Sequence, residues 1–368
     1  MRFFATAAKG TEPALRDELR ELRLPKIRAD RGGVHFEGQL RDAARACLWS
    51  RVGVRVLLEV AQLEAADDER LYDGVRSVDW TRWMTPRTTL AVRAHCRSSR
   101  LTHSQYVAQK TKDAVVDGLR DALGARPSVD KDDPDVRIAV HLVRDRATLY
   151  LDVGGSSLHE RGWRSRAGIA PLRETLAAAV LRLSGWDRQR PLVDPMCGAG
   201  TIAIEAAGWS RGMAPGLAHE RFGLERWASH DDEERQWLRS LREEARASAR
   251  PHGATVFARD VDPRAVELAR DNARAAGVEL VVEQGDVRDL APLEPAGFVV
   301  ANPPYGERLA TDDALAADLA KALRRMRGHT GALLAGTPAL GRAMRREPDR
   351  WWILFNGPIE CRLLVYAL

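Results

Sequence analysis

The chain has 368 residues, of which 45% are hydrophobic, so it is long enough for two or three domains with cores of their own, and global disorder is excluded. It has no apolar run as long as a membrane span and no signal-peptide stretch at its start, so we expect a soluble, cytoplasmic protein. The net charge of +5 lies entirely within residues 1–165, which fits either a solvated Arg-rich surface or a module that binds a polyanion.

Residues 1–60 are predicted to form a small α+β domain. The expected order is strand, helix, strand, helix, strand, over residues 3–6, a helix with Leu15, Leu19 and Leu22 at helical spacing, 31–36, 40–51 and 55–61. Residues 61–155 are predicted to form a second unit, with a strand over Thr89–His95, a long helix over Ser104–Leu123, and strands over Asp135–Leu142 and Ala147–Val153. The run Gly154-Gly155-Ser156-Ser157 marks its end, and residues 156–170 are interpreted as a linker.

Residues 171–368 change to an alternation of apolar strands and helices, which predicts a doubly wound parallel sheet of the α/β class. The expected elements cover 191–193, 201–209, 255–258, 263–276, 279–283, 297–300, 314–327 and 332–335. Trp351–Phe355 and Ile359–Ala367, joined by Asn356-Gly357-Pro358, are predicted to form a terminal antiparallel hairpin. The charged segment at about 210–254 is interpreted as a helical insertion beside the site.

A Gly-rich turn joins the strand at 191–193 to the helix at 201, with the sequence Asp194-Pro195-Met196-Cys197-Gly198-Ala199-Gly200-Thr201. Gly198 and Gly200 let the backbone approach a ligand closely, and the helix N-terminus at Thr201 favours a negatively charged group such as a carboxylate. Asp194 and Met196 are further candidates for ligand contacts in this turn. The alternatives are a plain strand-to-helix turn or a phosphate site, but the chain has neither GxGxxG nor GxxxxGK[ST] here, which argues against dinucleotide and P-loop sites.

Carboxylates also follow the next two predicted strands, at the sheet edge where ligands of open α/β folds bind. Asp260 is a candidate acceptor for both hydroxyls of a ribose, while Asp262 is expected to cap the helix that begins at Pro263. Asp286, followed by Val287, is a candidate acceptor for an adenine amino group. The alternative for Asp286 is a turn residue after Gly285.

The tetrapeptide Asn302-Pro303-Pro304-Tyr305 follows the buried strand at 297–301. The Asn302 side-chain oxygen and the Pro303 carbonyl can each accept one N–H of a planar exocyclic amine, and Tyr305 offers an aromatic face for stacking. Orientation and electrostatic stabilisation then carry the catalysis, and neither a covalent nucleophile nor a metal is required. A structural Pro-Pro turn is the alternative. Together with the Gly-rich turn, this tetrapeptide resembles the amine clamp and cofactor loop of S-adenosylmethionine-dependent N-methyltransferases. The resemblance implies that Asn302 also contacts the cofactor.

Beyond these motifs, the chain resembles the THUMP-domain RNA guanine-N2 methyltransferases, and most closely those of large-subunit (23S) ribosomal RNA. The resemblance rests on Ala170-Pro171-Leu172-Arg173-Glu174-Thr175-Leu176-Ala177-Ala178, on NPPYGERL from Asn302, on 96–110 and 126–131, and on Leu158-His159-Glu160-Arg161-Gly162-Trp163-Arg164. It implies a ferredoxin-like domain at 1–60, a THUMP RNA-binding domain at 61–155 and a Rossmann-like methyltransferase domain at 171–368. It also implies that Pro171 contacts the cofactor. Ala199 replaces a more usual serine, and Thr102 a more usual aromatic residue.

A THUMP domain implies an RNA partner that is recognised largely by shape. The candidate contacts with the RNA backbone are Arg97, Arg100, Lys110, Lys112, Arg126 and Lys131. Arg126 and Lys131 flank a loop and are favoured, whereas Lys110 and Lys112 lie on a helix whose lysines are often simply solvated.

The sequence therefore predicts an enzyme that methylates the exocyclic N2 of a guanosine in RNA, with 23S ribosomal RNA as the expected substrate. The alternatives are a tRNA guanine-N2 methyltransferase, an adenine-N6 or protein-glutamine N-methyltransferase, and a binding factor that keeps the fold without the activity. No metal is expected, since the four cysteines are scattered and the histidines lack ligand spacing.

Overall fold

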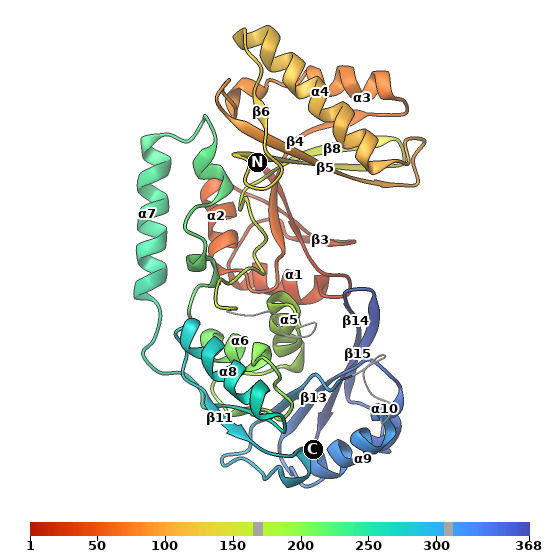
Figure 1. The fold of residues 1–368 in the computed structure, drawn as a ribbon, viewed down its shortest axis with the longest axis vertical. Helices are drawn as coiled ribbons and strands as arrows, with labels where there is room; N and C mark the ends of the chain where they lie inside the picture. Colours follow the sequence, from red (N-terminus) through yellow and green to blue (C-terminus); the bar gives the residue numbers. More distant parts are fainter. Residues whose placement is uncertain (165–171, 305–311) are drawn as a thin grey trace.

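The computed structural model describes residues 1–164, 172–304 and 312–368, which build two sheets stacked along the long axis of the molecule (Figure 1). The elements of the N-terminal half are β1 (Arg2–Thr6), α1 (Glu12–Glu21), β2 (Arg28–Asp30), β3 (Gly33–Glu37), α2 (Leu40–Trp49), β4 (Arg55–Glu64), α3 (Asp68–Arg76), the 3-10 helix η1 (Trp80–Arg82), β5 (Thr89–Arg97), α4 (Ser104–Leu123), β6 (Ser128–Val129), β7 (Val136–Val143) and β8 (Arg146–Asp152).

These strands form one eight-stranded sheet in the order β2-β3-β1-β4-β8-β7-β5-β6. The long strand β4 joins its two parts, because Leu58 pairs with Phe3 in β1 and with Leu151 in β8. The sheet thus continues across residue 60, where the sequence places a domain boundary, and the boundaries themselves stay predictions.

Helix α4 shows how local sequence sets an element. It runs over Ser104–Leu123, the range predicted from the sequence, and ends at Gly124, whose φ of 74° is in the left-handed region that glycine tolerates. Its N-cap is His103, whose side chain accepts a hydrogen bond from the Tyr106 N–H at 3.1 Å. Thr102 and Ser104 flank this cap.

The C-terminal half is a seven-stranded sheet in the order β11-β10-β9-β12-β13-β15-β14, parallel except where β15 pairs with β13 and β14. Its elements are α5 (Glu174–Ser184), β9 (Leu192–Asp194), α6 (Thr201–Ser210), β10 (Val256–Asp260), α8 (Pro263–Ala275), β11 (Val281–Gln284), the 3-10 helix η4 (Val287–Asp289), β12 (Phe298–Ala301), α9 (Asp312–Leu323), β13 (Thr330–Ala335), α10 (Ala339–Met344), β14 (Arg350–Asn356) and β15 (Ile359–Ala367). The predicted doubly wound sheet and its terminal hairpin are confirmed.

Strand β9 lies at the centre of this sheet and sets the position of the site. The chain moves from β9 through β10 to β11 on one side, then returns to β12 on the other side of β9. This reversal opens a crevice beyond the carboxyl ends of β9 and β12, the usual ligand position in open α/β sheets.

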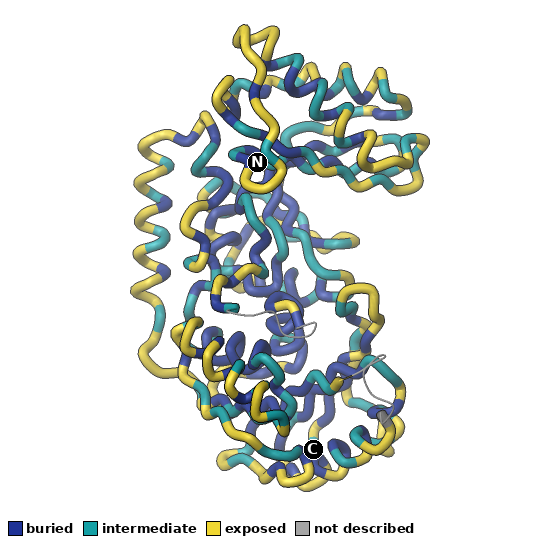
Figure 2. Tube along the Cα trace, viewed as in Figure 1, coloured by how far each residue is buried: buried dark blue, intermediate teal, exposed yellow. Residues whose placement is uncertain are grey.

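Helix α5 connects the two halves. Almost all of its residues are buried, and it contacts α1 of the N-terminal half as well as α6 and β13 of the C-terminal half (Figure 2). One continuous core cluster consequently includes both Phe3 in β1 and Val365 in β15. The sequence analysis did not assign this helix, because a helix buried all round lacks the amphipathic period on which such predictions depend.

The insertion contains the 3-10 helices η2 (Pro215–Ala218) and η3 (Gly223–Arg226) and the helix α7 (Asp232–Ala247). Its helical character is as predicted, but its expected place beside the site is wrong. Helix α7 and η2 pack against α2 of the N-terminal half, and η3 contacts β7 (Figure 1). The apolar stripe of α7 finds its partner on a surface that only the folded N-terminal half supplies.

Candidate active site

The Gly-rich turn after β9 forms an open cradle. Gly198 and Gly200 have φ values of 52° and 80°, in the region that disfavours side chains, and a Cβ on Gly198 would meet no atom within 4 Å. Helix α6 starts at Thr201, and no side chain among the described residues caps it. The first N–H groups of α6 therefore stay available to a negatively charged ligand group.

Two side chains from elsewhere hold this turn in shape. One oxygen of the Asp260 carboxylate accepts a hydrogen bond from the Gly198 N–H at 2.9 Å, and the other accepts from the Asp262 N–H at 3.0 Å. Each oxygen keeps a second lone pair, so the ribose role predicted for Asp260 remains chemically open. Asn272 of α8, which the sequence analysis missed, donates to the Ala199 carbonyl at 3.0 Å.

Asp194, at the end of β9, is only 1% exposed, and its carboxyl accepts one hydrogen bond, from the Met196 N–H at 3.3 Å. Burial, together with the nearby charge of Asp260, raises the pKa of Asp194 to about 8. Burial likewise raises the pKa of the Cys197 thiol, with Asp194 and Asp260 adding to the effect. A cationic ligand beside Asp194 would favour its ionised form.

Asn302 follows β12, on the other side of the crevice. Its side-chain oxygen is buried and has no hydrogen-bond donor among the described residues. A buried acceptor without a partner is costly unless a ligand satisfies it, so this atom is the strongest local sign of a binding role. Pro303 is half-buried beside it, while Tyr305, the predicted stacking partner, and Pro171, the predicted cofactor contact, lie outside the described residues.

Asp286 and Val287 follow β11, at the far side of β10 from the Gly-rich turn. The Asp286 carboxylate caps η4, accepting from the Arg288 N–H at 2.8 Å, and pairs with the Arg288 guanidinium at 2.6 Å. These contacts hold the pKa of Asp286 at about 2. The predicted adenine contact would have to compete with this exposed arginine, and Val287 is buried in the core.

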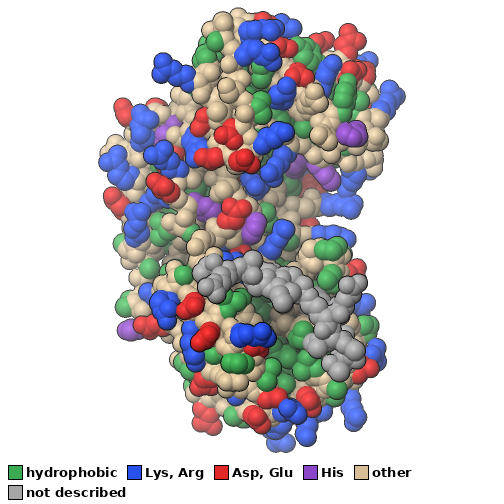
Figure 3. All heavy atoms as spheres, in the orientation of Figure 1, with side chains coloured by type: hydrophobic (Ala, Val, Ile, Leu, Met, Phe, Trp, Pro, Cys, Tyr) green, Lys and Arg blue, Asp and Glu red, His purple; other side chains and the backbone are tan. Residues whose placement is uncertain are grey.

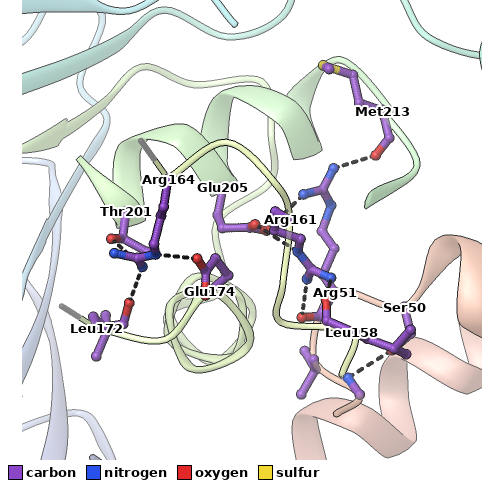
Figure 4. A network of polar contacts seen from close by, with 12 residues as sticks. Ser50, Arg51, Leu158, Arg161, Arg164, Leu172, Glu174, Thr201, Glu205 and Met213 are labelled. Atoms are coloured by element: carbon purple, nitrogen blue, oxygen red, sulfur yellow. Dashed lines mark hydrogen bonds and ion pairs between the residues drawn. The ribbon is translucent and has the colours of Figure 1, made fainter. Parts of the chain in front are cut away.

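Arg164 is a site residue that the sequence reasoning did not single out, although it ends the quoted segment Leu158 to Arg164. It donates to Glu174 at the start of α5, to the Leu172 carbonyl at 2.6 Å and to the Thr201 hydroxyl at 3.1 Å (Figure 4). Its third nitrogen, Nη1, is buried without a partner among the described residues. Arg164 thus joins the first turns of α5 and α6 and retains one buried N–H group.

Three of the six candidate RNA contacts form ion pairs within the protein, and one of these pairs joins Lys112 to Asp113. Arg100 forms an ion pair with Asp145 at 3.6 Å, and its backbone N–H donates to the same carboxylate. Lys110 pairs with Asp68 at 3.3 Å, so it is not the simply solvated lysine that the sequence analysis offered as its alternative.

The other three are unengaged. Arg97 ends β5 and is exposed, and Arg126 and Lys131 flank the short strand β6, both exposed. None of these three side chains forms an ion pair within residues 1–164, 172–304 and 312–368.

The described ranges contain no group of His, Cys, Asp and Glu side chains that could hold a metal ion. They also contain no helix that is both long and apolar enough to cross a membrane.

Three family models match the chain. They are the RlmL ferredoxin-like domain over residues 2–57, the THUMP domain over residues 65–152 and the RMKL-like methyltransferase domain over residues 161–364.

The alignments with two curated relatives cover the whole chain. It is 41% identical over 382 residues to the "Ribosomal RNA large subunit methyltransferase K/L" of Syntrophotalea carbinolica, and 44% identical over 377 residues to the protein of the same name from Methylococcus capsulatus. Both alignments include 100% of this chain but only 54% and 51% of the relative, so the chain spans about half the length of these curated relatives.

Solved structures match over their full length. The structure of SMU.472, crystallised in complex with SAH, is 30% identical and superposes with a TM-score of 0.90, covering 99% of this chain and 97% of that one. A cofactor of the S-adenosylmethionine type fits the open Gly-rich cradle and the start of α6, which no described side chain caps. It also fits the buried atoms of Asn302 and Arg164 that find no partner in the described part of the chain.

Proposed function

Because the chain belongs to the family of RMKL-like methyltransferases, we propose that it transfers a methyl group from S-adenosylmethionine to the exocyclic N2 of a guanosine in RNA, with 23S ribosomal RNA as its substrate. The family resemblance inferred from the motifs is confirmed, as is the S-adenosylmethionine-dependent class. The observation that carries the N2 assignment is the buried oxygen of Asn302, which has no hydrogen-bond donor within residues 1–164, 172–304 and 312–368.

The clamp works through the geometry of an aromatic amine. The N2 lone pair of guanine is delocalised into the ring, so the nitrogen is a poor nucleophile until its hydrogens are held out of the ring plane. The Asn302 side-chain oxygen and the Pro303 carbonyl would each accept one of these N–H groups, and positive charge developing on the nitrogen strengthens both bonds. Tyr305, next in the sequence, is predicted to stack on the base.

Different residues would hold different parts of the cofactor. Gly198, Gly200 and the start of α6 would receive the amino-acid end, Asp260 the ribose hydroxyls, and Asp286 the adenine. When bound, S-adenosylmethionine supplies a methyl group on a sulfonium that leaves as a neutral thioether, so the protein needs only to orient the amine and to exclude water.

Three observations support RNA as the substrate. The THUMP match lies over residues 65–152, the net positive charge lies in the N-terminal half, and the curated relatives carry names that specify large-subunit ribosomal RNA. A guanine in a helix would have to swing out of its stack to reach Asn302.

The test is a methyl-transfer assay with the purified full chain, labelled S-adenosylmethionine, and rRNA or tRNA taken from cells that lack the gene. Nucleoside digestion and mass spectrometry identify the product. N2-methylguanosine in the rRNA pool alone is the expected result. The same nucleoside in tRNA alone would overturn the substrate and keep the mechanism, and N6-methyladenosine or labelled protein would overturn the target amine.

A further inference from the structure

The two faces of the eight-stranded sheet differ in what covers them. Residues such as Phe3 and Val56 point into the core shared with α1 to α4, whereas Phe4, Leu57 and Tyr150 form a separate small cluster on the opposite face. Every residue of this cluster comes from a strand. In Figure 1, α3 and α4 lie above β4, β8 and β5, and the catalytic half lies on the other side of these strands.

One end of this helix-free face is basic. Arg93, His95 and Arg97 alternate along β5, so they point to the same side of the sheet. His95 lies opposite His141 in the neighbouring strand β7, and Arg137 of β7 points the same way. We call these five residues the β5–β7 face. The ring of His141 lies 4.9 Å from that of Tyr150, so the β5–β7 face is on the same side of the sheet as the small cluster that contains Tyr150.

The positive charge on the β5–β7 face is not neutralised. Arg93 and Arg97 are exposed and form no ion pair with any described carboxylate. Arg137 donates to a backbone carbonyl, that of Asp132, at 2.6 Å. Burial lowers the pKa of Arg137, and the nearby charges of Arg55 and Arg93 lower it further. These guanidinium groups therefore repel one another, and a bound anion would relieve the repulsion.

The nearby carboxylate of Asp152 cannot neutralise the positive charge of the whole β5–β7 face. Asp152 is buried and already holds Arg55 in an ion pair, and it also accepts from the N–H groups of Gly154 and Gly155, both at 3.1 Å.

Next to the β5–β7 face, aromatic side chains contact one another. The ring of Phe4 lies 4.6 Å from that of His35 and 5.9 Å from that of His141. Burial lowers the pKa of His141 to about 4, so this imidazole is neutral at physiological pH. In Figure 3, histidine side chains lie among Lys and Arg side chains where the N-terminal half meets the catalytic half.

We propose that the β5–β7 face binds the RNA backbone, with Arg93 and Arg97 neutralising phosphates. This inference rests on the proposed RNA substrate. Unpaired arginines in a row fit a phosphodiester chain, since guanidinium groups bind phosphate oxygens in a fork geometry. The face also lies toward the catalytic half, so bound RNA would extend toward Asn302. It differs from the loop of Arg126 and Lys131, which flanks the β6 edge of the sheet.

The test compares two double charge reversals in the full chain. Arg93→Glu with Arg97→Glu alters the face, and Arg239→Glu with Arg246→Glu makes the same charge change on α7, where both arginines are exposed and unpaired among the described residues. Binding to deproteinised bacterial 23S rRNA is measured by filter retention at several KCl concentrations. Titration with S-adenosylhomocysteine checks that each variant keeps its cofactor site.

For the face variant we expect the slope of log affinity against log salt to shrink by about 2, one unit for each lost phosphate contact. The α7 variant should keep the wild-type slope. An unchanged slope in the face variant would overturn this inference and leave the proposed function intact. No RNA binding by the wild-type chain would instead overturn the RNA substrate. If the double variant fails to fold, Arg93→Gln should shrink the slope by about 1, and an unchanged slope in that variant would also refute the inference.

Discussion

Arg51 and Glu205 are 154 positions apart in the sequence, and their side chains form an ion pair of 2.8 Å that is almost completely buried (Figure 4). Arg51 follows α2 in the N-terminal half, whereas Glu205 lies one turn after Thr201 in α6. Arg161 binds the other oxygen of Glu205 at 3.2 Å and donates to the Arg51 carbonyl at 2.8 Å. The pair therefore ties the N-terminal half to the helix that follows the Gly-rich turn.

Breaking this pair should destabilise the protein strongly. In Glu205→Gln, two buried guanidinium groups lose their shared counter-charge, and removing one partner of a buried pair typically costs about 3–5 kcal/mol. The free energy of unfolding in urea is the measurement. The matched control is Asp232→Asn, whose exposed pair with Arg235 should be worth less than about 1 kcal/mol. Equal effects of the two substitutions would show that the buried pair does not anchor the halves.

Asn302→Ala should abolish methyl transfer and leave cofactor binding nearly intact. The substitution removes an acceptor for the target amine, and losing one such group typically lowers kcat by a factor of about 100 to 1000. Turnover on RNA and the affinity for S-adenosylhomocysteine are measured side by side. A parallel loss of both would contradict the clamp and indicate that Asn302 chiefly holds the cofactor.

The contribution of Asp194 to the stability of the ligand-free protein should fall as the pH rises from about 4 to 8. Asp194 has a folded-state pKa of about 8, above its ordinary value of 3.8, so the folded state retains a proton that the unfolded state loses in this window. The slope from this group can reach about 1.4 kcal/mol per pH unit. Asp194→Asn should remove it, as measured by thermal unfolding between pH 5 and 8.

Asp286→Asn is the control of opposite sign. Because the pKa of Asp286 is lowered to about 2, its stabilising contribution is present above pH 4 and is lost as the pH falls toward 2. This variant should keep the wild-type slope between pH 5 and 8. An Asp194→Asn protein with the wild-type slope would show that another group titrates there.

Arg164→Lys should weaken binding of S-adenosylhomocysteine by about tenfold. The lysine keeps the charge but loses the planar fork that contacts Glu174, the Leu172 carbonyl and Thr201, and a hydrogen bond to a charged group is worth about 1.5–3 kcal/mol. Titration with methylthioadenosine, which lacks the amino-acid end, should show a smaller loss. Arg173→Lys, at an exposed neighbour, serves as the control, and equal losses for both ligands would contradict a role at the start of α6.

Arg126→Glu with Lys131→Glu tests the loop that the sequence favoured. If this loop contacts RNA, the affinity of the variant for RNA should fall and the salt dependence of RNA binding should flatten, as for any lost phosphate contact. Filter binding to rRNA at several salt concentrations is the measurement. An unchanged salt slope would remove the loop from the interface.

The local features of this protein follow from its sequence alone. The Gly-rich turn, the start of α8 at Pro263 with Asp262 as its cap, and the bounds of α4 are all set by residues within a few positions of each other. Turn geometry, capping and hydrophobic period are short-range effects, so they can be predicted without knowing what packs against them. The motif at Asn302 is visible for the same reason.

The tertiary structure decided which side chains and strands contact one another. The sequence offered Arg51, Arg161 and Glu205 as three unremarkable charges, and only folding removes them from water and pairs them across the two halves. Similarly, β4 joins two units into one sheet because strand pairing depends on segments far apart in the chain. The same long-range pairing places β5, with Arg93 and Arg97, beside β7. Burial and pairing are long-range effects, and they determined that the Asn302 oxygen is buried without a hydrogen-bond donor from any residue that the structure describes.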